Sequence, residues 1–163
     1  MGLRLLNSFA IRAGGDHKLT LVTQQIGNPT EVQTFLSRRH GHFIDGGWQT
    51  DEGAELLAVK CPSTGLNIAH IENGGQSVVD DAVKAARRSF EARVWADMVP
   101  VERARILFSL ADLIEQHAEQ ISFLEALDIG VSRGLMRNIG VKLAADQLRY
   151  YAGWVTKING ETI

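Results

Sequence analysis

The chain of 163 residues has the length of one ordinary domain, and its 45% hydrophobic and 22% charged residues exclude wholesale disorder. Seventeen Lys and Arg against nineteen Asp and Glu leave a net charge of −2, which argues against a nucleic-acid partner because such surfaces need a basic stripe. No window approaches the roughly 18 consecutive apolar residues of a membrane span. The single cysteine, Cys61, can form no internal disulfide, so we expect a cytoplasmic protein without a membrane partner.

The first 28 residues differ in composition from the rest of the chain. They mix apolar residues with arginines and carry the pair Gly14-Gly15. Because chain termini are poorly ordered unless they are tied down, we expect residues 1–28 to be a disordered or spurious leader and residues 29–163 to be the folded segment. A targeting presequence is the alternative, since such segments bear arginine and few acids, but no small-residue cleavage site follows.

The pattern of regular structure begins with a short helix after Pro29. Thr30 stands at a capping position and Gln33 stands three residues later, so we expect a helix that runs to about Arg39. Short β-forming segments follow at 42–44 and 48–49, and the Asp45-Gly46 step between them predicts a hairpin. Two more strands are expected at 56–59 and 67–71, on either side of the turn at 62–65.

After Gly74-Gly75 the apolar period changes from two to about 3.6, which predicts four helices. Ser77 and Asp80 resemble a capping box for the first helix, and Pro100 opens the second. The third stops near Gly130, and the last runs from about Ser132 to Asn159-Gly160. The expected apolar stripes are Val79, Ala82, Val83, Ala86 and Phe90; Ala104, Leu107, Leu110, Ala111 and Ile114; Ile121, Leu124 and Leu127; and Leu135, Ile139, Leu143, Leu148, Ala152 and Val155.

Residues that could carry chemistry are few. Cys61 precedes a proline in a turn with no neighbouring base in sequence, so we interpret it as an inert cysteine rather than a nucleophile. His40 and His42 would share one face of a strand and could hold a metal, but no further ligand motif accompanies them, so solvated histidines are favoured. Gly74-Gly75 precedes a helix without the spacing of a phosphate-binding fingerprint, so we interpret it as a loop.

Several segments stand in a characteristic order. They are His42-Phe43-Ile44-Asp45-Gly46-Gly47-Trp48, Pro62-Ser63-Thr64-Gly65, residues 79–86 (VDDAVKAA), 95–105 (WADMVPVERAR), 110–115 (LADLIE), 124–128 (LEALD) and 149–154 (RYYAGW). This order resembles the N-terminal portion of the NAD(P)-dependent aldehyde dehydrogenase superfamily over about residues 31–163. Residues 32–46 look more specifically like its phenylacetaldehyde dehydrogenase branch.

The resemblance implies an α/β fold, with a short β-hairpin arm followed by about four amphipathic helices, and without the catalytic domain. In the family, the nucleophilic Cys, the general-base Glu and the cofactor-binding motifs come after the matched region. We therefore expect a truncated aldehyde dehydrogenase whose parent oxidises an aldehyde to a carboxylic acid with NAD or NADP. This chain alone is expected to have no catalytic or cofactor-binding residues and no activity.

The resemblance also implies one metal site. In the family, an Asp near this helix end and two main-chain carbonyls before the proline turn often hold a structural monovalent cation. Carried over to this sequence, the ligands are Asp128, Val59 and Lys60. The family's Lys after the helix-ending Gly is Val131 here. A surface carboxylate without an ion is the alternative.

A second function stays open beside the truncated enzyme. Amphipathic helices that lack their sheet expose the stripe that they would bury, so the chain can instead be a non-catalytic helical interaction or oligomerisation module. Its partners would then be copies of itself or full-length aldehyde dehydrogenase subunits. The DNA downstream of the Ile163 codon would discriminate between the two hypotheses.

Overall fold

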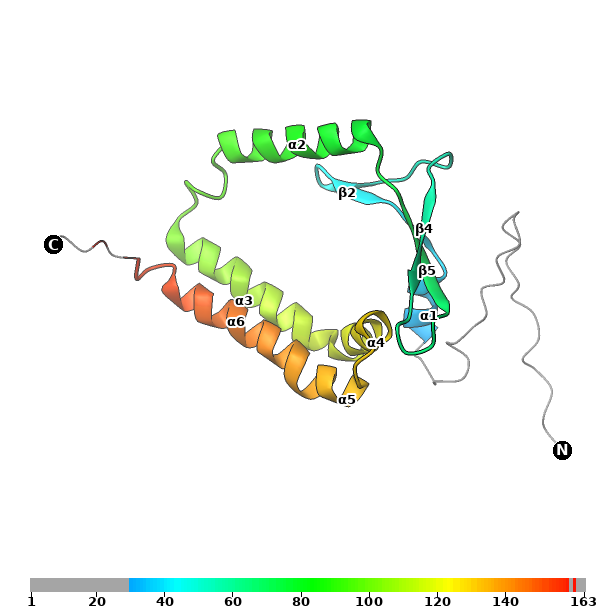
Figure 1. Ribbon diagram of the computed structural model, residues 1–163. Coiled ribbons are helices and arrows are strands. Elements are labelled where there is room, and N and C mark those ends of the chain that lie inside the picture. The colour runs from blue at the N-terminus through cyan, green and yellow to red at the C-terminus, as the bar shows by residue number, and fades with distance from the viewer. Residues whose placement is uncertain (1–29, 159, 161–163) are drawn as a thin grey trace.

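The computed structural model describes residues 30–158 and residue 160. The expected leader at 1–28 lies outside the described residues, so the expectation for it stays a prediction. The element order is α1 (Thr30–Leu36), β1 (Arg39–His40), β2 (His42–Ile44), β3 (Gly47–Gln49), β4 (Leu56–Lys60), β5 (Asn67–Glu72), α2 (Gln76–Glu91), α3 (Pro100–Gln116), α4 (Ala118–Ile129), α5 (Arg133–Leu135), a π-helical turn (Met136–Gly140) and α6 (Val141–Trp154). Figure 1 shows α2 on one side of the molecule and the α3–α6 pair on the other.

The strands form two small sheets. In the first, β4 and β5 are antiparallel and β1 joins β5 in parallel, giving the order β1-β5-β4. In the second, β2 and β3 form the expected hairpin, with Ile44 opposite Gly47. Asp45 and Gly46 both have positive φ, 54° and 79°, which a two-residue hairpin turn of the favoured twist requires. The hairpin predicted from Asp45-Gly46 is therefore confirmed.

The main core lies where α1, the first sheet and α4 meet. Seven residues from these elements and the adjoining turn form one buried cluster: Val32, Leu36, Cys61, Ile68, Ala69, Phe123 and Leu127. Each is less than one tenth exposed. Burial of this kind stabilises by about 25 cal/mol per Å² of apolar surface, so the cluster holds the sheet against α4.

Two helix boundaries differ from those expected. α1 ends at Leu36 rather than near Arg39, because Arg39 and His40 leave the helix and pair with His70 and Ile71 of β5. α2 begins at Gln76 with Gly75 at its N-cap, and no side chain caps it, so the Ser77 capping box is wrong. Gln76 instead donates a 2.8 Å hydrogen bond to Asp80 within the helix.

The last helix differs more from its expectation. It begins as predicted at Ser132, whose hydroxyl accepts the Leu135 amide at 3.3 Å. It then passes through the π-helical turn and ends at Trp154 rather than at Asn159-Gly160. The residues that follow Trp154 include β-branched ones, which disfavour a helix. A π turn holds an extra residue and rotates the helix beyond it, so the buried face runs through Val141, Ala145 and Ala152. Leu135, Ile139 and Leu143 of the predicted stripe are about half exposed.

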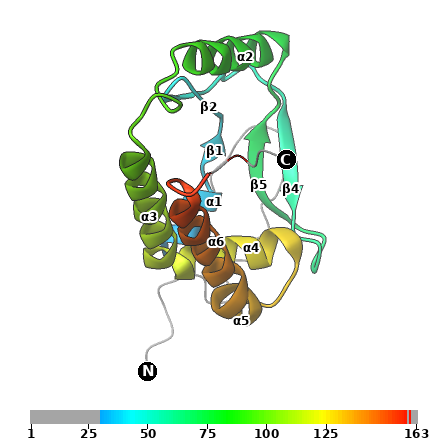
Figure 2. The same cartoon turned by 90° about the vertical axis from the view of Figure 1, so that its left-hand side faces the viewer.

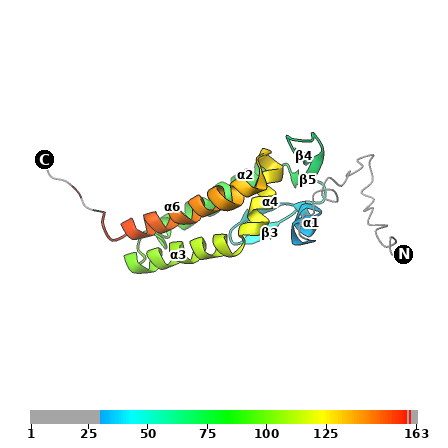
Figure 3. The same cartoon turned by 90° about the horizontal axis from the view of Figure 1, so that it is seen from below.

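Small residues and one arginine join α3 to α6, which lie side by side in Figures 2 and 3. Ala111 of α3 and Ala145 of α6 are fully buried, so the helices approach closely. Arg149 donates to Asp112 and to Glu115 of α3, each at 2.7 Å. The Glu115 and Asp112 carboxylates raise the pKa of Arg149 above its ordinary value, and the Arg149 hydrogen bond lowers the pKa of Glu115 despite partial desolvation.

No helix in the described part of the chain is both long enough and apolar enough to cross a membrane.

Candidate functional site

The turn after β4 and the C-terminal end of α4 lie against each other. Gly130 ends α4 with a left-handed φ of 74°, and a Cβ added to it would lie 2.8 Å from Cγ of Pro62. The Ser63 hydroxyl donates to the Gly130 carbonyl at 3.4 Å. The glycine is thus needed both for its backbone angle and for the close approach of the two segments. The fold brings the helix end that holds Asp128 to the turn that follows Val59 and Lys60.

The proposed cation ligands are oxygen donors of two kinds. Asp128 has an exposed side chain, Val59 is half-buried, and Lys60 is exposed. One carboxylate and two main-chain carbonyls are hard ligands that suit an alkali or alkaline-earth cation. Residues 30–158 and 160 contain no group of three or more His, Cys, Asp or Glu side chains that could hold a metal ion. The cation site at Asp128, Val59 and Lys60 stays a prediction.

Cys61 is buried at the start of the same turn. Its amide donates to the Leu66 carbonyl at 2.9 Å, and its carbonyl accepts the Gly65 amide at 2.7 Å, so the backbone is closed into a tight loop. Burial raises the pKa of the thiol, but hydrogen bonds from the Thr64 side chain and from Ser63 outweigh burial and leave the pKa below its usual value. Cys61 as a whole is 3% exposed, so a substrate cannot reach its thiol without opening the turn.

An ionic cluster joins β1, β5 and the loop after β3. The Glu72 carboxylate is buried, accepts the Asp51 amide at 2.9 Å and forms an ion pair with Arg39. The Asp51 amide hydrogen bond lowers the pKa of Glu72, burial opposes that effect, and the Arg39 guanidinium lowers it further. Arg39 also donates to the main-chain carbonyls of Asp51, Glu52 and Ala54. The cluster fixes the course of the loop that leads into β4.

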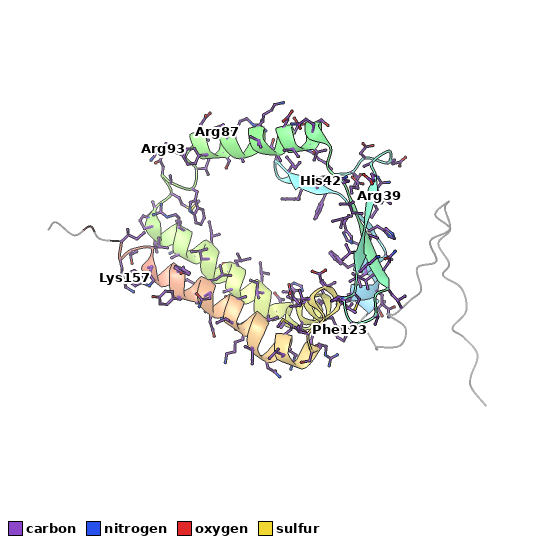
Figure 4. All side chains as sticks on the ribbon, in the orientation of Figure 1. Arg39, His42, Arg87, Arg93, Phe123 and Lys157 are labelled. Atoms are coloured by element: carbon purple, nitrogen blue, oxygen red, sulfur yellow. The ribbon has the colours of Figure 1, made fainter. Side chains whose placement is uncertain are left out.

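The structure places His40 and His42 in different surroundings. The His40 ring donates from Nε2 to the Phe35 carbonyl at 2.9 Å and packs on the Phe35 ring. His42 lies close to Gly74, and its Nε2 is buried with no hydrogen-bond partner in the part of the chain that is described. Arg39 and His42 lie near one another in Figure 4. Both histidines are half-buried, and neither belongs to a group of described residues that could hold a metal ion.

Sequence reasoning missed the Arg39–Glu72 pair. The two residues stand 33 positions apart, and the parallel pairing of a two-residue strand is what makes them neighbours. The only sequence signal was a charged residue at the edge of each β-forming segment, which is usually solvent-exposed. The alternation of apolar and polar residues along a strand does not distinguish a buried glutamate from an exposed one.

Known proteins are similar to this chain in both sequence and fold. The family model "Aldehyde dehydrogenase family" matches residues 48–163. The chain is 37% identical over 132 residues to the protein DhaS of Bacillus subtilis (strain 168), covering 81% of this chain and 27% of that protein. It is 34% identical over 151 residues to the cytosolic 10-formyltetrahydrofolate dehydrogenase of Xenopus laevis, covering 91% of this chain and 16% of that protein. The chain therefore spans about a quarter or less of the length of these relatives.

Solved structures are similar to this chain as well, and they too are longer than it. The aldehyde dehydrogenase of Bacillus cereus in its NAD+ complex superposes with a TM-score of 0.76 at 38% identity, covering 83% of this chain and 28% of that one. HpcC from Thermus thermophilus superposes with a TM-score of 0.73 at 32% identity, covering 82% of this chain and 26% of that one. The predicted α/β fold, as part of the fold of these enzymes, is confirmed.

Proposed function

Because this chain belongs to the aldehyde dehydrogenase family, we propose that its residues form part of the cofactor-binding domain of an enzyme that oxidises an aldehyde to a carboxylic acid with NAD or NADP. The similarity of the described fold to the Bacillus cereus enzyme in its NAD+ complex is the observation that carries the proposal. The part played by these residues is architectural. The core of α1, the first sheet and α4 holds the turn at Cys61, and α3 and α6 form a paired helical layer.

We propose further that the 163 residues by themselves do not catalyse the reaction. Covalent aldehyde oxidation needs an accessible thiolate beside a base and oxyanion donors, and bound NAD or NADP supplies the hydride acceptor. The only thiol of the chain is that of Cys61. Cys61 is 3% exposed, and its thiol is hydrogen-bonded to Thr64 and Ser63 rather than to a histidine or glutamate. This environment favours a thiol that packs in the core.

The test is an activity assay on the purified chain. With NAD or NADP and either phenylacetaldehyde or a short aliphatic aldehyde, we expect no reduced cofactor above a buffer blank. The Cys61→Ala variant is the matched control and should give the same blank-level signal. Turnover that survives purification and disappears in Cys61→Ala would contradict the proposal, because it would place the chemistry at this cysteine.

The cation hypothesis is part of the same proposal. Asp128 would supply a carboxylate, and Val59 and Lys60 would supply carbonyl oxygens, to a monovalent cation with a structural role. The proximity of the Gly130 end of α4 to the Pro62 turn supports this assignment. Such an ion stabilises the folded chain by mass action, so unfolding in chloride salts of Na⁺ or K⁺ should occur at a higher temperature than in the tetramethylammonium salt at equal ionic strength. Asp128→Asn should abolish that difference, and a difference that persists would contradict the ligand set.

A second candidate function, a non-catalytic interaction module, is favoured by one observation. Large apolar side chains on α3, α6 and the connection at 92–99 are about half exposed, among them Trp95, Leu113 and Tyr151. Exposed apolar surface of this extent is typical of a protein interface. We propose that copies of this chain, or subunits of an aldehyde dehydrogenase, cover it in a cytoplasmic setting. Light scattering over a concentration series should then show dimers or larger species, and a monomer at all concentrations would contradict this function.

A further inference from the structure

A groove of about 240 Å³ lies beside the end of α1, between β1 and β3. Its walls are formed by Phe35, Arg38, Arg39, His40, Trp48 and Thr50, together with the backbone at Gly41. Arg39 marks its position in Figure 4. The groove is separate from the Cys61 turn and from the end of α4. Its volume suits a compound with one ring, since drug-sized ligands occupy roughly 300–1,000 Å³.

Aromatic rings form two of the walls. The Phe35 ring packs on the His40 ring with centroids 4.4 Å apart, and Trp48 contacts Phe43 edge-on at 5.4 Å. Phe35 is 44% exposed and Trp48 is 69% exposed, so both present ring surface to solvent. Exposed rings of this kind on a groove can stack with a planar ligand, since offset and edge-on pairs of rings attract each other.

Arg38 is the available cation among the described residues that line the groove. Arg39 is fully engaged with Glu72 and the carbonyls of the loop after β3, and His40 donates to the Phe35 carbonyl. The Arg38 side chain, in contrast, is exposed and forms no hydrogen bond or ion pair with another described residue. No Asp or Glu is among the lining residues. An arginine without a partner in such a groove is suited to a carboxylate, which it can bind through two parallel hydrogen bonds.

Gly41 allows the β1–β2 connection to approach the end of β3 closely. A Cβ at this position would lie 2.0 Å from the Gln49 carbonyl and 2.8 Å from the Thr50 side chain, so no other residue fits without displacing the backbone at the end of β3. The φ of this glycine is not left-handed, which means that close approach, and not backbone angle, requires it. The chain at Thr50 therefore stays directly beside the β1–β2 connection and forms the groove with it.

We propose that this groove binds a small planar aromatic compound that carries a carboxylate. The ring stacks against Trp48 and Phe35, and the carboxylate pairs with Arg38. The two contacts are chemically distinct, so a ligand that lacks either the ring or the charge binds more weakly. This site is independent of the aldehyde dehydrogenase chemistry proposed above, since it uses none of the residues assigned there.

The experiment is a titration of the full 163-residue chain, labelled with ¹⁵N, followed through the indole N–H signals of its three tryptophans. Benzoate is the probe, benzamide supplies the ring without the charge, and acetate supplies the charge without the ring. The Trp48→Phe variant identifies the Trp48 signal. We expect benzoate to shift that signal with a dissociation constant on the order of 1 mM, and benzamide and acetate to bind about tenfold more weakly.

Two arginine variants give the matched comparison. Arg38→Gln should weaken benzoate binding about tenfold, the effect of losing one charge-assisted hydrogen-bonded pair. Arg87→Gln removes the same charge from α2, outside the groove, and should leave binding unchanged. The proposal would be overturned if benzoate and benzamide bound equally, or if the two arginine variants lost the same amount of benzoate affinity. It would also be overturned if the shifts were confined to Trp95 and Trp154, or if the spectrum had no dispersed indole signals.

Discussion

The region of α1, the first sheet and α4 and the region of α2, α3 and α6 contain similar apolar residues but bury them to different extents. In the first region, Phe123 and Leu127 are each 5% exposed within the seven-residue cluster. In the second, α2 has no buried residue at all, and Phe90 is 76% exposed. α3 and α6 bury chiefly alanine against each other and leave their larger side chains half exposed.

This difference shows that an apolar stripe and a core are separate properties. The stripe follows from the spacing of residues on one helix, whereas a core needs a second surface at the right distance. The sheet and α1 supply that surface to α4. α2 meets β2 of the small hairpin, and the Arg88–Asp45 ion pair at 2.9 Å joins the two, but it buries no side chain there. The two regions should therefore respond differently to matched substitutions.

The largest difference is expected between two phenylalanines. Phe123→Ala removes a ring from the main core and should lower the free energy of unfolding by about 3 kcal/mol. Phe90→Ala removes a ring that is mostly in solvent and should change it by less than about 0.5 kcal/mol. Urea unfolding followed by circular dichroism measures both. Equal effects of the two substitutions would mean that α2 is packed as tightly as α4.

A smaller effect is expected at the glycine that joins α4 to the Cys61 turn. Gly130→Ala forces a left-handed φ on a residue with a side chain and drives its Cβ against Pro62, so it should cost about 1–2 kcal/mol. Gly134→Ala is the control, since no atom lies within 4 Å of its added Cβ. This control should be neutral or slightly stabilising because alanine favours a helix. Thermal unfolding of both variants measures these effects. A Gly130→Ala variant with an unchanged melting temperature would contradict the close contact with Pro62.

The pH dependence of stability should distinguish Glu72 from Glu115, although the folded chain lowers the pKa of both. The pKa of Glu72 is lower in the folded chain than in the unfolded one, so its contribution is present above the unfolded pKa of about 4.3 and is lost as the pH falls through the folded value. Glu72→Gln should flatten the decline of the melting temperature below about pH 5 by a few degrees. Glu115→Gln should flatten it less, because solvent screens that carboxylate, which is 45% exposed. The reverse ranking would contradict the burial of Glu72.

The smallest effect concerns the α3–α6 pair. Arg149→Gln removes the contacts to Asp112 and Glu115 and should lower the free energy of unfolding slightly at low salt, with a smaller loss at high salt. Arg105→Gln removes a neighbouring exposed pair within α3, to Glu102, and should cost about half as much or less. Urea unfolding at two salt concentrations measures both. An effect of Arg149→Gln that salt does not change would mean that packing, and not charge, makes this contact.

The sequence by itself determined the local elements, because neighbouring residues decide them. Asp45-Gly46 specifies the hairpin, Pro100 starts α3, Gly130 ends α4, and Ser132 caps the next helix. The family resemblance also located the candidate cation ligands, although spacing and composition alone do not point to them. Each of these features depends on a few adjacent residues or on a recognisable order of motifs.

Only the tertiary structure decided which residues meet across the chain. The burial of Glu72 depends on Arg39 and Asp51, which reach it through the pairing of β1 with β5 and through the loop after β3. The buried face of α6 depends on the π-helical turn before it, which no periodicity count includes. The groove at Arg38 and Trp48 likewise exists because α1 ends early and β3 returns beside it. Such contacts follow from the geometry of separate segments packed together, which the spacing within any one segment does not contain.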